Sequence, residues 1–253
     1  MTATVSSPST RSTHRRKARD VRRFRRIVAA VILLVPATTV AIGRLFATDD
    51  SDTTKALDLV AADLGRQFTL TLLSFFAIVT FVPAFLAAGR LAKRRRPVLA
   101  MIALGVNLIA YVSAWSFPAL NNMYFAGARL PAEQRDGAAA LIDAMWAHGF
   151  LSISAMLMVI GSVSGAILMG LALRGSIPIA GWIAMILSQP AHVLFEVFPL
   201  PAIDALAWGL MALAFAFCAV AVLRTPDNEW DLPPLSATSE SATSHHGEQG
   251  EPE

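Results

Sequence analysis

Long apolar stretches separated by short polar connections run through most of this chain. A window of about 19 residues finds six of them: residues 27–43, 68–89, 97–120, about 146–173, 177–198 and 202–223. Most reach the ~20 residues that a helix needs to cross ~30 Å of hydrocarbon. Because lipid offers no hydrogen-bond partner to the backbone, each stretch predicts a helix. The predicted fold is therefore all-α, a polytopic transmembrane helical bundle of six spans.

The composition agrees with burial in a membrane. Hydrophobic residues make up 55% of the 253 positions and charged residues only 15%, against about 45–50% and about 25% in an ordinary soluble domain. A single cysteine excludes a disulfide framework and a multi-cysteine zinc site. The sequence has no Gly-x4-Gly-Lys-Ser/Thr loop, no His-Glu-x-x-His and no Cys-x-x-Cys. We therefore expect a protein that is not an enzyme.

The charges divide the chain into three parts. Residues 1–26 hold nine Lys or Arg and one acid, and residues 224–253 hold seven acids and one Arg. Both ends lack the apolar content that ordering requires, so we expect disordered tails on either side of a membrane domain at 27–223. The basic tail adjoins an apolar stretch and contains only one aromatic residue, Phe24. Its expected partner is therefore the anionic headgroups of the bilayer, and no nucleic acid.

The loop charges predict the orientation. Sixteen Lys or Arg residues fall on the side that includes both tails, and five fall on the other side. The excess marks the cytoplasmic side, which puts both termini in the cytoplasm. An alternative stays open for the first stretch: as a signal peptide cleaved near residue 43 it would leave five spans.

Both larger outer loops contain helix signals. Residues 55–64 predict a short amphipathic helix lying on the outer membrane face. A second helix is expected to begin at Pro131-Ala132-Glu133.

Polar residues of the last three spans and their loops gather at one depth. Gln189, His192 and Glu196 share a helical face near the outer end of the fifth stretch, because they are spaced by three and four residues. The predicted polar layer consists of Asp143, His148, Gln189, His192, Glu196 and Asp204.

Four interpretations of this layer remain open. It can be structural, with headgroup-level carboxylates in water and Gln189 and His192 bonded to neighbouring helices. It can be the outward-facing cavity of a small transport or membrane-accessory protein, with a polar solute or a proton as its cargo. It can also bind a divalent metal through imidazole and carboxylate ligands, or a haem through two histidines. No cofactor is expected on the first two interpretations.

The fourth stretch contains glycines at a packing spacing. Gly161-x-x-x-Gly165 is a small-xxx-small pattern, which predicts close approach of another helix. The neighbouring Ser162-Val163-Ser164-Gly165 resembles the Gly-x-Ser-Gly of rhomboid intramembrane proteases. However, Ser164 should lie roughly 17 Å deeper than His192, too far for a nucleophile and its base.

The arrangement resembles small six-span integral membrane proteins of high-GC, actinobacterial-type bacteria, a group without an assigned function. The resemblance rests on the Arg-rich start at 22–26, the acidic first outer loop, the basic turn at 90–96 and spans rich in Ala, Leu and Val. It implies a location in the bacterial inner (plasma) membrane and no catalytic residue.

Overall fold

The computed structural model describes residues 21–47, 52–147, 149–197 and 201–231, and this part of the chain contains helices and no β-strand. The helices are α1 (Arg22–Leu45), α2 (Thr53–Ala62), α3 (Leu64–Lys93), α4 (Pro97–Ser113), α5 (Ser116–Ala128), α6 (Ala132–Ala147), α7 (Phe150–Leu173), α8 (Ile179–Val197), α9 (Pro201–Arg224) and α10 (Asp227–Trp230). The all-α fold expected from the sequence is confirmed for the described residues.

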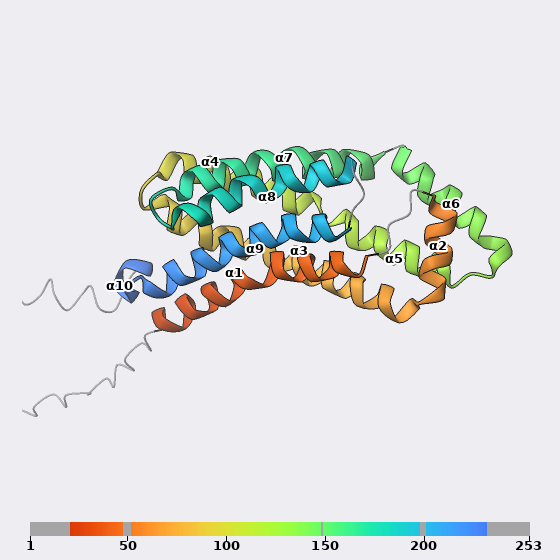
Figure 1. Ribbon diagram of the computed structural model, residues 1–253, viewed down its shortest axis with the longest axis horizontal. Coiled ribbons are helices and arrows are strands. Elements are labelled where there is room, and N and C mark those ends of the chain that lie inside the picture. The colour runs from red at the N-terminus through yellow and green to blue at the C-terminus, as the bar shows by residue number, and fades with distance from the viewer. Residues whose placement is uncertain (1–20, 48–51, 148, 198–200, 232–253) are drawn as a thin grey trace, which may run out of the picture.

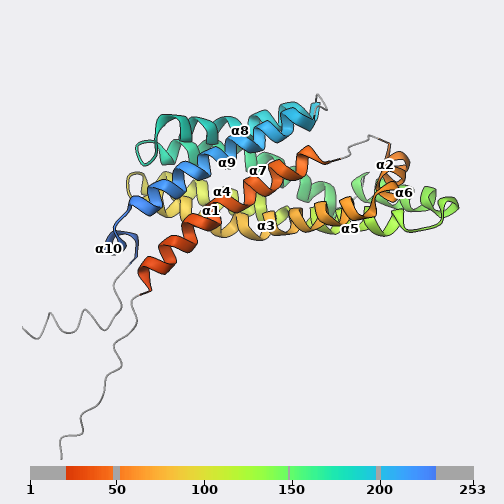
Figure 2. The same ribbon diagram turned by 60° about the horizontal axis from the view of Figure 1, so that its bottom comes forward.

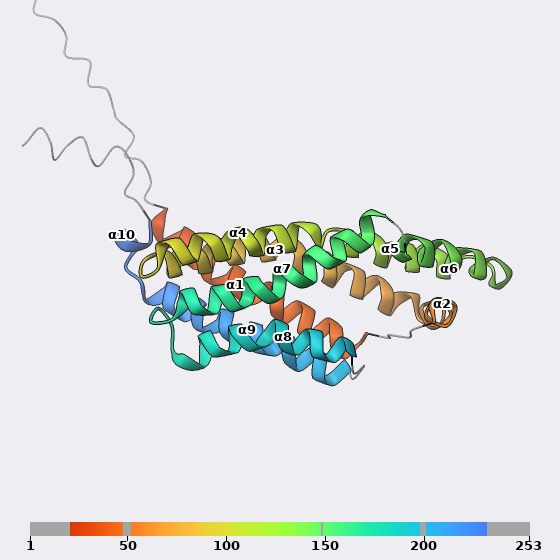
Figure 3. The same ribbon diagram turned by 90° about the horizontal axis from the view of Figure 1, so that it is seen from above.

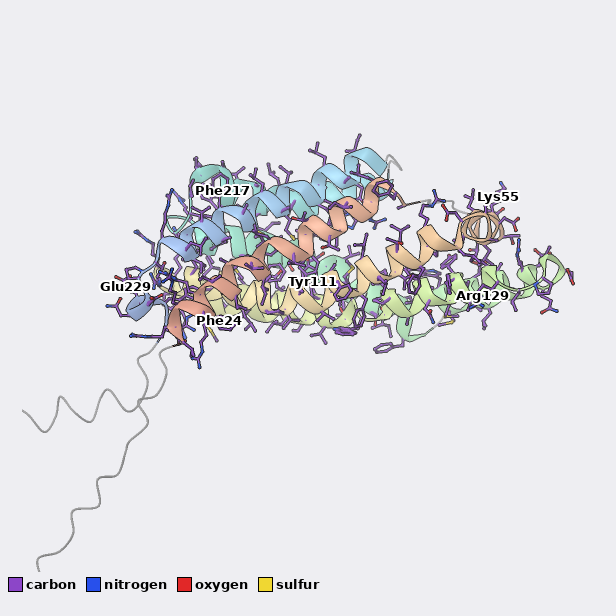
Figure 4. All side chains as sticks on the ribbon, turned by 90° about the horizontal axis from the view of Figure 1, so that it is seen from below. Phe24, Lys55, Tyr111, Arg129, Phe217 and Glu229 are labelled. Carbon is purple, nitrogen blue, oxygen red and sulfur yellow. The ribbon has the colours of Figure 1, made fainter. Side chains whose placement is uncertain are left out.

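Six long helices form an elongated ring in the order α1, α9, α8, α7, α4 and α3, and each packs against its two neighbours in the ring (Figures 1 and 3). Aromatic side chains fill its middle. Phe81 stacks on Tyr111 with ring centroids 4.2 Å apart, and Phe85 meets Phe215 edge-on at 5.3 Å. All four are fully buried. The aromatic core therefore joins α3, α4 and α9 in the middle part of the molecule along its long axis, where Figure 4 labels Tyr111.

In the described part of the chain, five helical segments are long and apolar enough to cross a membrane: α1, α3, the combined segment Pro97–Ala128, α7 and residues Ile203–Arg224 of α9. The helix α8 is also apolar but shorter, at Ile179–Leu194. Large apolar side chains are exposed around the ring, including Val98 and Phe150 at 72% and 78%, and Figure 4 shows side chains projecting outward along all the helices. An apolar exterior of this extent is typical of a multi-pass membrane protein.

The third apolar stretch is divided in two. The helix α4 ends at Ser113 and α5 begins at Ser116. Pro118 explains the division, because it has no N–H to donate to the carbonyl of Ala114 four residues earlier. The Phe117 N–H bonds that carbonyl instead, at 3.0 Å. The single span expected at 97–120 is therefore a helix with a break near its end, followed by α5.

The helices α2, α5 and α6 form a cap that extends beyond the ends of α8 and α9 (Figures 2 and 3). Leu57, Leu120 and Ile142 belong to its own hydrophobic cluster. The amphipathic helix expected at 55–64 is present as α2, and its apolar face packs on α5 and α6. The helix expected from Pro131 is also present, as α6, with Glu133 in its first turn.

The fourth apolar stretch begins later than expected. The sequence suggests a helix from about residue 146, but α6 continues to Ala147 and α7 begins at Phe150. Gly149 makes the turn with φ of 101°, a backbone conformation that side-chain-bearing residues rarely adopt. Residues 146 and 147 therefore belong to the cap.

Both predicted tails lie mainly outside the described residues, which exclude 1–20 and 232–253. The described parts are helical: α1 already begins at Arg22, and α10 lies within the segment assigned to the acidic tail. Residues 21 and 231 lie at the same end of the molecule, opposite the cap (Figure 1). We call these two ends the α10 end and the cap end.

Candidate functional site

An aspartate from α9 joins a histidine and an arginine from two other helices. The Nδ1–H of His192 on α8 donates to Oδ1 of Asp204, and Nε of Arg44 on α1 lies 2.8 Å from Oδ2 of the same carboxylate. Because a carboxylate only accepts hydrogen bonds, the imidazole must be the donor. We call these three residues the Asp204 network.

Two helix ends explain why the opposite charges meet. Arg44 lies in the last turn of α1, and Asp204 lies in the first turn of α9. A helix favours a cation at its C-terminus and an anion at its N-terminus, so each charge sits at the end that stabilises it. Both α1 and α8 pack against α9. The network therefore ties together the cap-end termini of three ring helices.

The network is largely shielded from solvent. His192 and Asp204 are 6% and 8% exposed, and the side chain of Arg44 is 30% exposed. Charges removed from water are costly unless they are paired. Here the carboxylate of Asp204 is paired with the guanidinium of Arg44 and accepts from the imidazole of His192.

Gln189 lies one helical turn from His192 on the same face of α8. Its side chain is fully buried, and neither Oε1 nor Nε2 has a hydrogen-bond partner among the described residues. The buried Nε1 of Trp208 is likewise without an acceptor there, and the Trp208 ring lies 5.1 Å from the His192 ring. A buried amide without a partner costs roughly 1–3 kcal/mol. Polar atoms able to bind a solute therefore lie next to the network.

The other members of the predicted layer are not joined to this network by any described contact. Asp143 is exposed on α6 and accepts a hydrogen bond of 2.5 Å from the Thr53 hydroxyl, within the cap. His148 lies outside the described residues, as does the side chain of Glu196. Of the six predicted residues, the structure brings His192 and Asp204 into contact and puts Gln189 beside them.

Sequence reasoning missed Arg44 as a site residue, because it was counted only as a loop charge. A signal was present, however. Arg44 directly follows the first apolar stretch on the side that has few positive charges, and Asp204 begins the sixth stretch on that same side. Opposite charges at one predicted depth favour an ion pair.

The metal and haem interpretations remain untested predictions. The described residues contain no group of three or more His, Cys, Asp or Glu side chains that could hold a metal ion. His192 and Asp204 would supply two ligands, and Asp204 is already paired with Arg44. His148 and the Glu196 side chain lie outside the described part, so a complete ligand set is not assembled there.

The predicted packing glycines lie where α7 meets α4. A Cβ added at Gly161 would lie 2.8 Å from Cβ of Ala110, and one added at Gly165 would lie 2.7 Å from Oδ1 of Asn107. Both distances are too short for carbon in van der Waals contact. The two helices therefore approach closely at these glycines.

Ser164, the residue considered as a nucleophile, lies in the same part of α7. Its hydroxyl donates to the Ile160 carbonyl of its own helix at 2.6 Å. His192 is bonded instead to Asp204. No described contact therefore joins Ser164 to His192.

Comparison with known proteins adds no assignment to this geometry. No protein-family model matches this chain, and no curated protein or solved structure matches it.

Proposed function

We propose that the chain is a multi-pass protein of the bacterial plasma membrane, with six spans and both termini in the cytoplasm. The ring supports α8 as the sixth span, because α8 packs between α7 and α9. Its 19 residues extend roughly 28 Å at 1.5 Å per residue, close to the ~30 Å of hydrocarbon. The excess of Lys and Arg on the side of the α10 end supports the orientation.

Cysteine labelling in intact cells tests this topology. In a Cys218→Ala background, Lys55→Cys on α2 should react with a membrane-impermeant maleimide before lysis, whereas Lys93→Cys at the end of α3 should react only after lysis. Both parent lysines are exposed, which makes the pair matched in reagent access. Labelling of position 93 in intact cells would contradict the orientation.

We further propose that the Asp204 network, with Gln189 beside it, binds a small anionic solute, as the outward-facing site of a small transport protein. The observation that carries this proposal is the group of buried polar atoms without a described partner beside the network, namely Oε1 and Nε2 of Gln189 and Nε1 of Trp208. A solute that accepts hydrogen bonds from these N–H groups, as an anion does, would satisfy them within the shielded site.

Gln189 supports the same proposal. Its amide can donate and accept hydrogen bonds, and both of its polar atoms are buried without a described partner one turn from His192. A polar solute would satisfy this amide at little cost, because the amide has already lost its water. Gln189 therefore gives the site a means to select a solute by hydrogen bonding.

Thermal stability of the purified protein tests the proposal. Chloride, phosphate, acetate and glutamate serve as probes at one pH. At least one anion should raise the melting temperature. His192→Gln should reduce this response. Gln189→Leu should abolish the response while adding about 1–2 kcal/mol of stability, because it removes an unpaired buried amide.

Gln67→Leu on α3 is the matched control, since it removes a half-buried amide far along the chain from α8. It should keep the response. Proteoliposomes with the native protein should take up an anion that passes these tests faster than proteoliposomes with Gln189→Leu. If no anion stabilises the native protein more than His192→Gln, the network is structural and the proposal is wrong.

A further inference from the structure

The short helix α10 is held by charge against the α10 end of the bundle. Asp227 forms an ion pair with Arg26 at 3.2 Å, and Glu229 forms one with Arg94 at 3.3 Å. Trp230 is only 3% exposed. The acidic segment after α9 thus packs on basic side chains from α1 and the end of α3, at the end of the molecule where Figure 4 labels both Glu229 and Phe24.

Asp231 makes the central contact of this arrangement. Its carboxylate lies 2.8 Å from Nη1 of Arg25 on α1 and 3.2 Å from Nη2 of Arg90 on α3. The Asp231 side chain is 13% exposed, whereas the two arginine side chains are 62% and 46% exposed. The Asp231 carboxylate therefore bridges the guanidinium groups of Arg25 and Arg90, whose outer sides are exposed and can be reached by a larger anion. Phosphate oxygens suit such a pair of guanidinium groups.

An apolar groove of about 370 Å³ leads away from these two arginines. Its α1 wall contains Phe24, Val28 and Ile32, and its α3 wall contains Pro83 and Leu86. The wall residues of α1 are four apart, so the groove follows the helix axis for eight residues, or about 12 Å. Arg25 and Arg90 lie at one end only, because α1 and α3 lie side by side in opposite directions (Figure 2).

We propose that this groove binds an anionic phospholipid, whose phosphate lies between Arg25 and Arg90 in place of the Asp231 carboxylate. Charge complementarity selects the phosphate, and the length and direction of the apolar walls fit the first part of an acyl chain lying along the helices. Phe24 and Leu86 are 68% and 48% exposed, so the groove is continuous with the lipid-facing surface. A soluble phosphate compound would leave the apolar walls unused. The site is independent of the proposed solute site at the cap end.

The proposal gives α10 a definite role. Asp231 occupies the headgroup position when no anionic lipid is bound, and the lipid must displace it. Each arginine near an anionic headgroup contributes about a fivefold factor to binding. Removal of the competing carboxylate should strengthen binding by a similar factor, whereas loss of either arginine should weaken it.

Native mass spectrometry of the full chain in detergent tests these expectations. The probes are phosphatidylglycerol and phosphatidylcholine with identical acyl chains, and inorganic phosphate as a competitor. Phosphatidylglycerol should bind more tightly than phosphatidylcholine. Arg25→Gln and Arg90→Gln should each weaken its binding about fivefold, and Asp231→Asn should strengthen it about fivefold. Phosphate at the lipid concentration should not displace it, because phosphate lacks the acyl chain.

Three further variants separate the groove from general effects. Val28→Phe fills the groove and keeps every charge, so it should weaken phosphatidylglycerol binding. Arg174→Gln removes an arginine that packs over Trp182 outside the groove, and it should have no effect. Glu229→Gln loosens α10, which carries the competing Asp231 carboxylate, so it should strengthen lipid binding, but by less than Asp231→Asn does.

Several results would overturn the proposal. These are equal binding of the two lipids, full displacement by inorganic phosphate, equal losses in Arg174→Gln and Arg90→Gln, or unchanged binding in Asp231→Asn. Val28→Phe guards against misfolding as an explanation, because its thermal stability can be compared with that of the native protein before lipid is added. A folded Val28→Phe variant with unchanged binding would also contradict an acyl chain in the groove.

Discussion

Replacing Asp204 with asparagine is expected to lower the free energy of unfolding by about 3 kcal/mol. The substitution keeps the shape of the side chain and removes its charge. Arg44 then loses its 2.8 Å ion pair at a largely shielded site, and the imidazole of His192 loses a charged acceptor. The carboxylate accepts from both side chains, and each hydrogen bond to a charged group contributes about 1.5–3 kcal/mol.

Equilibrium unfolding in mixed SDS and mild-detergent micelles, followed by circular dichroism, measures this change. Asp58→Asn is the matched control. It removes an aspartate paired with Arg135 at the same 2.8 Å distance, but the Asp58 side chain is 60% exposed. An exposed pair contributes about 0–1 kcal/mol, so the control should be nearly neutral. Equal losses in the two variants would contradict the difference in burial on which the prediction depends.

The double variant Arg44→Gln, Asp204→Asn distinguishes pairing from packing. If the two residues interact, the double variant should lose less stability than the sum of the two single variants. His192 then keeps a neutral amide partner. If the double variant is as unstable as the sum of the single variants, the two residues act separately and the ion pair has no special role.

The sequence was sufficient to predict the long apolar helices. A run of apolar residues long enough to cross hydrocarbon leaves the backbone no alternative to a helix, and the ends of α3, α8 and α9 lie within four residues of the predicted stretches. The differences arise at single residues. Pro118 divides the third stretch and Gly149 delays the fourth, and both act through the backbone, which hydropathy does not measure.

The cap was predictable only in pieces. The amphipathic pattern of α2 gave a correct apolar face, since Leu57 and Val60 are buried. The pattern could not distinguish a protein surface from a lipid surface as the partner of that face, because both are apolar. The surface that covers this face belongs partly to α5, which continues past Pro118 towards α2. That contact is part of the tertiary structure and cannot be predicted from the local pattern.

The candidate site was predicted by looking for polar residues within apolar stretches. This rule finds site residues that lie inside a span and misses site residues that lie just outside it. It found His192 and Gln189, because a polar residue inside a span is conspicuous. It did not find Arg44, Arg90 or Asp231, because charges just outside the spans are expected there. Ion pairs between the ends of different helices require that α1, α9 and α8 lie next to one another in the ring. Hydropathy does not predict which helices of a bundle are neighbours.

The close approach of α4 and α7 makes glycine substitutions there the most damaging changes we expect. Gly161→Leu should lower the free energy of unfolding by more than about 3 kcal/mol, since overpacking by a few methylene groups alone costs about 1–3 kcal/mol. The first atom added, Cβ, would lie 2.8 Å from Cβ and 3.3 Å from Cα of Ala110. The Cα belongs to the backbone of α4, so the clash cannot be relieved by a side-chain rotation and the helices must separate.

Gly165→Leu should also destabilise the protein, but by less. Its Cβ would meet the amide of Asn107 at 2.7–2.8 Å, and a side chain can move where a backbone cannot. Movement would break the 2.7 Å hydrogen bond from Nδ2 of Asn107 to the Ala103 carbonyl. That loss costs about 1 kcal/mol, in addition to the strain of repacking.

Gly105 on α4 provides the matched control, because a Cβ there meets nothing within 4 Å. Gly105→Leu should be neutral or stabilising by up to about 1 kcal/mol, since leucine favours the helix more than glycine does. The same SDS titration measures all three variants. A Gly161→Leu protein as stable as Gly105→Leu would mean that α4 and α7 do not depend on the glycine contact. The expected order of stability, with Gly105→Leu highest and Gly161→Leu lowest, follows from the atom that each new Cβ meets.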